Sequence, residues 1–224
     1  MPTTQPTTAA IVAAALDLAE NQGWRNVTLA AIAARSGHSL ADLLTEFPTK
    51  EAILKAFALQ VDHDVLKDPF DDAGTVRDRL FDLLMRRFDA LAPRRAALRA
   101  ILRDTLGDPF AALSGLCALH RSMTLTLEAA GASASGAIGQ VRVKALGAIY
   151  LHALYEWLQG ESDDTDRVMA QIDKSLARAE RIATSFSTQR ERLRERRHAR
   201  RTARHQPGDV EASAASAADA AERA

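Results

Sequence analysis

The stretch GWRNVTLAAIAARSGHSLADLLTEFPTKEAIL, residues 23–54, contains the start and stop signals of several short helices in close succession. Thr28 and Ser39 each precede an apolar segment, and their hydroxyl oxygens are expected to accept hydrogen bonds from backbone N–H groups at helix N-termini. Gly37 lies between them and supplies a turn that needs positive φ. Thr49, after a proline, is expected to begin a longer helix. The stretch therefore predicts two short helices joined by a sharp turn, with a third helix following.

Apolar side chains in this region are spaced so that the helices can share a core. Ile32, Leu43 and Phe47 are expected to fill the space between the short helices. The preceding segment, residues 8–21, is expected to form a helix as well. Four of its apolar residues share one helical face: Ile11, Ala15, Leu18 and Ala19. Three helices in the first 47 residues, two of them short, are typical of a helix-turn-helix unit.

Residues 8–60 resemble the N-terminal domain of TetR-family transcriptional regulators. The matching features are the G-W-x-x-V-T-L run at Gly23–Leu29, the I-A-A-x-x-G turn at Ile32–Gly37, Ser39, the Leu43 to Phe47 spacing, and the F-P-T-K-E sequence that follows. The resemblance implies an all-α fold, in which a three-helix helix-turn-helix domain precedes a larger helical domain for ligand binding and dimerisation. It also implies that the third helix lies in a major groove of DNA while the second contacts the backbone.

Eight residues follow from this resemblance as candidate DNA contacts: Thr28, Ser39, Leu40, Asp42, Leu44, Thr45, Glu46 and Lys50. Four of them depart from the family's usual residues, since Leu40 replaces Lys, Asp42 replaces Thr, Leu44 replaces Tyr, and Glu46 replaces His or Tyr. Asp42 lies three residues after Ser39 and can instead complete a capping box with it. Glu46 can accept a bond from a cytosine amine or be a solvated acid, and the two leucines can contact thymine methyl groups or pack on a partner.

The charge of the N-terminal region gives little attraction for DNA. Residues 1–62 hold four basic and six acidic side chains, a net charge of −2. DNA affinity normally comes largely from neutralised phosphates. Residues 178–205 hold ten Arg and three Glu, a net charge of +7. This second segment is either an electrostatic arm for an anionic surface or a solvated helix end.

The rest of the chain predicts a helical body. Thr75 with Asp78 indicates a capping box, Asp108-Pro109 a helix start, and a long helix is expected to end before Gly160. The last helix has one apolar stripe: Val168, Ile172, Leu176, Ala179, Ile182 and Phe186. We therefore expect three regions: a helix-turn-helix domain over residues 1–50, a ligand-binding and dimerisation domain over residues 51–186, and a basic helix extension with a disordered tail over residues 187–224.

By the same resemblance, the larger domain encloses a small apolar ligand. Five residues are candidates to line that site: Met85, Phe88, Cys117, Met123 and Tyr150. Cys117 lies in an apolar run and is expected to be buried. The last two long helices are expected to join two copies in a homodimer. The predicted function is a ligand-responsive repressor that binds double-stranded DNA, with no enzymatic activity, cofactor or metal.

A weaker resemblance leaves a second function open. LFDLLMRRFDALAPRR, residues 80–95, and KALGAIYLHALYEWLQ, residues 144–159, are distantly similar to the TetR-fold lipid-binding protein of ubiquinone biosynthesis. That resemblance implies an accessory protein that binds an isoprenoid lipid and has lost DNA reading. A single cysteine excludes an intramolecular disulfide, and neither a signal peptide nor a membrane span is expected. The sequence therefore predicts a cytoplasmic protein.

Overall fold

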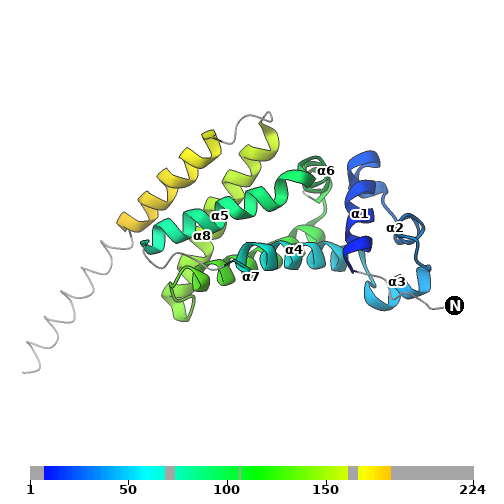
Figure 1. The fold of residues 1–224 in the computed structure, drawn as a ribbon, viewed down its shortest axis with the longest axis horizontal. Helices are drawn as coiled ribbons and strands as arrows, with labels where there is room; N and C mark the ends of the chain where they lie inside the picture. Colours follow the sequence, from blue (N-terminus) through cyan, green and yellow to red (C-terminus); the bar gives the residue numbers. More distant parts are fainter. Residues whose placement is uncertain (1–7, 69–73, 106, 161–165, 183–224) are drawn as a thin grey trace, which may run out of the picture. The chain divides into compact units, whose positions relative to one another are not determined.

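The computed structural model describes residues 8–68, 74–105, 107–160 and 166–182, and these ranges contain helices and no strand (Figure 1). The N-terminal elements are α1 (Thr8–Gln22), the 3₁₀ turn η1 (Trp24–Asn26), α2 (Leu29–Ser36), α3 (Leu40–Glu46) and α4 (Lys50–Leu66). The later elements are α5 (Val76–Leu91), η2 (Ala92–Arg94), α6 (Arg95–Thr105), α7 (Pro109–Ala129) and α8 (Gly136–Gln159). Helical residues are also present at 166–182. The all-α prediction is confirmed.

The chain divides into two compact units, with the boundary after Ala177. Helices α1 to α8 and both hydrophobic cores belong to the first unit. None of the described helices is both long and apolar enough to cross a bilayer.

The helices begin where the capping residues predict. The Thr75 hydroxyl accepts from the Asp78 N–H, while the Asp78 carboxylate accepts from the Thr75 N–H, which completes the predicted capping box of α5. Asp108 accepts from the backbone N–H groups of Phe110 and Ala111 at the start of α7. These bonds satisfy donors that have no partner within the helix itself. The local sequence alone therefore fixes most helix starts.

A first hydrophobic core holds the N-terminal helices together. It contains 15 buried residues, among them Ile32 and Leu43 at 0% exposure and Phe47 at 6%, as the sequence predicts. Ala97 and Ile101 of α6 also belong to this core, because α6 packs along α1. The core is therefore built from more than the first 50 residues, although the predicted domain limits at residues 50 and 186 remain predictions.

A second core fills the helical body. It brings together α4, α5, α7, α8 and the helical residues at 166–177. Val168, Ile172 and Leu176 are buried there, as the predicted stripe requires, whereas Ile182, in the second unit, is 51% exposed. Phe186 lies outside the described residues. Each large apolar side chain removed from water contributes roughly 1.5–3 kcal/mol, so this core dominates the stability of the body.

Helix α4 contributes to both cores. Ile53, near its start, is buried in the N-terminal core, and Val61 and Val65, near its end, are buried in the body core. Phe57, between them, packs against both. A displacement of the second half of α4 would therefore also shift α4 residues that pack in the N-terminal core.

Helix α6 also connects the N-terminal helices with the body. On one side, Asp104 accepts a 2.7 Å bond from the backbone N–H of Arg25. On the other, the Arg99 guanidinium donates to the backbone oxygens of Leu158 and Gly160 at the end of α8. Arg95 donates to the Gly160 oxygen as well, at 2.7 Å. Cations at a helix C-terminus interact favourably with its dipole, so these two arginines stabilise the end of α8.

Candidate nucleic-acid interface

The turn between α2 and α3 is a left-handed helix end followed at once by a new N-cap. Gly37 adopts φ 75° and ψ 23°, and its N–H donates to the Ala34 oxygen. The next N–H, of His38, donates to the Ala33 oxygen at 3.0 Å. This pair of bonds closes α2 in a Schellman motif, which requires a residue that tolerates positive φ. Glycine at residue 37 therefore sets the angle at which α3 leaves α2.

Both short helices start from the predicted hydroxyl caps. The Thr28 hydroxyl accepts from the Ala31 N–H at 3.1 Å, and the Ser39 hydroxyl accepts from the Asp42 N–H at 3.1 Å. The Ser39 hydroxyl also donates to the Asp42 carboxylate at 2.6 Å. The Asp42 carboxylate thus has the Ser39 hydroxyl as a partner, whereas no bond from the Ser39 backbone N–H completes the predicted capping box. A residue in this position is held rigidly relative to the start of α3.

Helix α3 has one buried residue and an exposed remainder. Leu43 is fully buried beneath it, and the other six residues of the helix are exposed. Leu40 and Leu44 are each 42% exposed, one helical turn apart. The buried leucine holds the helix to the core while the rest of its surface is presented outward. This is the arrangement that a helix needs in order to enter a DNA groove.

Lys50 starts α4 beside this surface and is oriented by Trp24. Its ammonium donates to the Trp24 backbone oxygen at 3.1 Å and lies 5.1 Å from the centre of the Trp24 ring. The indole is buried, so it is a fixed support for a half-buried lysine. A cation–π contact of this kind attracts the ammonium to the ring without removing it from solvent. The position of the lysine side chain is therefore fixed relative to η1.

The structure places all eight predicted DNA-contact residues at the N-cap of α2, along α3 and at the start of α4. Seven of them are exposed, and Lys50 is half-buried. Two polar side chains on α3 already have intramolecular partners besides the Ser39 and Asp42 cap. Thr45 donates to the Ala41 oxygen at 2.9 Å, and Glu46 accepts from the Thr8 hydroxyl at 2.6 Å. The Glu46 bond links α3 to the first turn of α1, which sequence reasoning did not identify.

The five predicted ligand-lining residues do not form one group. Phe88, Met123 and Tyr150 are buried in the body core, and Met85 packs against it. The Phe88 ring lies 5.7 Å from the Tyr150 ring. Burial raises the pKa of the Tyr150 hydroxyl to about 12, and the nearby Arg87 guanidinium opposes this only in part.

Cys117 is exposed, so the prediction of a buried thiol is wrong. The first half of α7 turns its apolar side chains away from the body core, and Phe110, Leu113 and Leu116 are 84%, 61% and 53% exposed. An apolar run was therefore a misleading sign of burial at this position.

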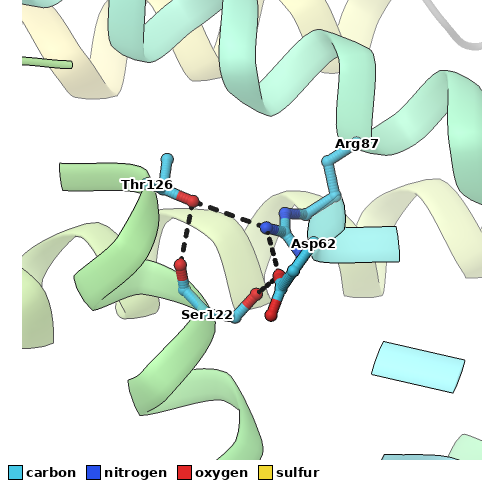
Figure 2. Close-up of polar contacts among 4 residues, drawn as sticks. All are labelled: Asp62, Arg87, Ser122 and Thr126. Atoms are coloured by element: carbon cyan, nitrogen blue, oxygen red, sulfur yellow. Dashed lines mark hydrogen bonds and ion pairs between the residues drawn. The ribbon is translucent and has the colours of Figure 1, made fainter. Parts of the chain in front are cut away.

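Sequence reasoning missed a buried polar cluster in the body. Figure 2 shows Asp62 of α4, Arg87 of α5 and Ser122 and Thr126 of α7 in mutual contact. Asp62 lies three residues before Val65 on α4, and Arg87 lies four residues after Leu83 on α5, so each charged residue falls on the buried apolar face of its helix. That pattern was the available signal. Within the described residues, no group of His, Cys, Asp and Glu side chains is arranged to hold a metal ion.

Comparisons with known proteins agree with this geometry. The family described as "Bacterial regulatory proteins, tetR family" matches residues 11–57, which span α1 to the middle of α4. None of the curated proteins matches the chain.

Solved structures extend the likeness over most of the chain. A TetR transcriptional regulator from Nitrosomonas europaea is 25% identical with a TM-score of 0.64, over 78% of this chain and 98% of that one. A tetR-family regulator from Streptomyces coelicolor is 16% identical with a TM-score of 0.58, over 96% and 99%. One from Rhodococcus sp. RHA1 is 20% identical with a TM-score of 0.57, over 75% and 92%. Together with the helix-turn-helix geometry, these matches show that residues 11–57 are similar to the N-terminal domain of TetR-family transcriptional regulators and that the fold is similar to theirs.

Proposed function

We propose that this protein is a TetR-family, ligand-responsive repressor that binds double-stranded DNA as a homodimer and releases it when a small apolar molecule binds the body. The observation that carries the proposal is the outward surface of α3, which Leu43 anchors from below and Lys50 flanks. The contacts with DNA would come from the predicted set: Thr28, Ser39, Leu40, Asp42, Leu44, Thr45, Glu46 and Lys50. TetR-family regulators are transcription factors and not enzymes, which agrees with the prediction of no enzymatic activity.

A stripe of exposed residues along α8, apolar apart from His152, supports the homodimer. Its members recur at alternating spacings of three and four residues: Ile138, Val141, Ala145, Ala148, His152 and Tyr155. Ile138, Val141 and Tyr155 are 45%, 67% and 48% exposed in the single chain. A stripe with this period fits against a second helix of the same kind. A dimer would also hold two α3 helices at the fixed span of about 34 Å that successive major grooves require.

The proposed division of labour follows the sequence. Residues 1–50 read DNA, and residues 51–186 bind the ligand and dimerise; the basic extension predicted at residues 187–224 lies outside the described residues. Phe88, Met123, Tyr150 and Met85 are the proposed lining residues, supported by their position in or against the body core. Cys117 is left out because it is exposed.

A matched pair of lysine variants tests DNA binding. Lys50→Met and Lys55→Met each remove one positive charge from α4, but only Lys50 is held beside α3 by Trp24, and Lys55 is exposed further along. Binding to DNA from the chain's own upstream region would be measured over a salt series. We expect Lys50→Met to weaken binding about tenfold and to lower the salt slope by about 1, with a smaller effect for Lys55→Met.

Absence of binding at low salt would contradict the proposal. Should the purified protein also carry an isoprenoid lipid, the lipid-binding alternative would replace it. The exposed, acidic and apolar surface of α3 is the feature that favours this second function.

A further inference from the structure

Four buried polar side chains meet at the centre of the helical body. Asp62, Arg87, Ser122 and Thr126 are 5%, 4%, 3% and 1% exposed. Arg87 Nη2 donates to Asp62 Oδ1 at 2.7 Å, and the Ser122 hydroxyl donates to the same oxygen (Figure 2). Arg87 Nη2 also lies 3.4 Å from the Thr126 hydroxyl, which donates to the Ser122 backbone oxygen. The cluster ties α4 to α5 and α7.

Asp62 accepts from only some of the N–H donors of Arg87. A guanidinium can bind a carboxylate side-on, through two parallel N–H groups. In this structure Asp62 Oδ1 accepts from Arg87 Nη2 alone among the guanidinium nitrogens, and the same oxygen also accepts from the Ser122 hydroxyl. Arg87 Nε is buried, and no acceptor among the described residues reaches it. A buried donor without an acceptor is unfavourable, so this edge of the guanidinium favours a carboxylate that can bridge Nε and Nη2.

The surroundings of Arg87 are apolar apart from this cluster. The guanidinium carbon lies 5.8 Å from the centre of the Tyr150 ring, and Phe88 contacts the same ring. Met123 is buried in the same core. A ligand that pairs with Arg87 would therefore place its remaining atoms among aromatic and aliphatic side chains.

We propose that Arg87 is the recognition residue for an apolar carboxylate effector, and that Asp62 occupies its anion site until the effector's carboxylate replaces it. This inference rests on the proposed function, because it assigns a chemical class to the ligand of the body.

The exchange of carboxylates explains how the ligand would act on DNA binding. Once displaced, Asp62 is a buried charge without a counter-ion, which is strongly unfavourable unless it reaches water. Asp62 is 5% exposed, so we infer that it reaches water through a movement of the second half of α4. The same helix buries Ile53 in the N-terminal core and begins at Lys50 beside α3. Ligand binding and DNA binding are therefore opposed through α4, and each lowers the affinity for the other equally.

The first experiment tests whether Arg87 accepts a free carboxylate, and it needs no DNA. Asp62→Ala leaves space for a small anion, so acetate should raise the melting temperature of this variant in a saturable way. The acetate affinity obtained from that rise should be at least tenfold higher than the affinity of the unaltered protein. Acetamide, which has the same shape without the charge, should have no such effect. Acetate should also fail to stabilise Asp62→Ala with Arg87→Met. Equal effects of acetate and acetamide would overturn the proposal.

The second experiment uses full-length protein with octanoate, dodecanoate and hexadecanoate, each beside its primary alcohol and below micelle-forming concentrations. We expect at least one acid to bind more tightly than its alcohol, and Arg87→Met to abolish that preference. Asp62→Asn keeps the shape of Asp62 but removes the competing charge. It should bind the acid about tenfold more tightly and DNA more weakly. A purely structural ion pair predicts no gain in acid binding, and that result, or no preference for any acid, would overturn the proposal.

Failure of the proposed function is distinguishable from failure of this inference. Carboxylate selection by Arg87 without any DNA binding would contradict the repressor but support the anion site. DNA release by alcohols and acids alike would support a ligand-responsive repressor but overturn the role of Arg87.

Discussion

Replacing Gly37 with alanine isolates the backbone conformation of the turn between α2 and α3. Gly37 has φ 75°, and a Cβ added there would meet no described atom within 4 Å. The cost therefore comes from the left-handed conformation alone, about 1–2 kcal/mol for a residue with a side chain. Alanine also restricts the unfolded chain, which offsets about 0.4–1 kcal/mol. We expect Gly37→Ala to lower the free energy of unfolding by about 0.5–1.5 kcal/mol.

Gly115 is the matched control, because a Cβ there also meets no described atom within 4 Å. It lies within α7 and does not have positive φ, so alanine should stabilise the helix by about 1 kcal/mol. Gly136, with φ 68° and equally open surroundings, should behave like Gly37. Urea denaturation followed by circular dichroism measures all three, provided that the m-values agree. If Gly37→Ala and Gly115→Ala shift stability in the same direction, the assignment of the cost to φ is wrong.

Three further predictions concern the core, the buried phenol and the surface of α3. Leu43→Ala should lower the free energy of unfolding by about 2–5 kcal/mol, and Leu44→Ala, at a 42% exposed position, by under about 0.5 kcal/mol, in the same urea assay. Because the pKa of Tyr150 is raised to about 12, the stabilisation from its neutral hydroxyl should be complete below pH 10 and decline by about 2–3 kcal/mol toward pH 12. Tyr150→Phe should lack this decline when the free energy of unfolding is measured against pH. Equal declines in the two proteins would contradict the prediction. Glu46→Gln removes an acid from the proposed interface and should raise DNA affinity several-fold at low salt in anisotropy titrations, an increase that must shrink as salt is added.

The sequence predicted well those features that depend on neighbouring residues. Thr28, Ser39 and Asp108 cap their helices because a side-chain oxygen needs only to reach an N–H two or three residues away. Gly37 was predictable for a similar reason, since a left-handed helix end strongly favours glycine. The inward position of Leu43 agrees with its spacing of four residues from Phe47, whereas the exposed position of Leu40 was expected from the family resemblance.

Contacts between distant segments were not predictable in this way. Asp62 and Arg87 each lie on the apolar face of a helix, but only packing determines that they face each other. The bond from Thr8 to Glu46 likewise joins residues 38 positions apart. Cys117 shows the opposite error, because an apolar run does not reveal whether another helix covers it. Which charged side chains pair, and which apolar faces another helix covers, depend on the tertiary structure.

The presence of α4 in both hydrophobic cores has a consequence for how the first unit comes apart. If each core had its own helices, either could melt while the other stayed intact. A continuous helix with Ile53 in one core and Val61 in the other couples the two transitions. Amide protons around Phe57 should therefore exchange with solvent deuterium only through the rarest, most complete opening, and more slowly than those of α3.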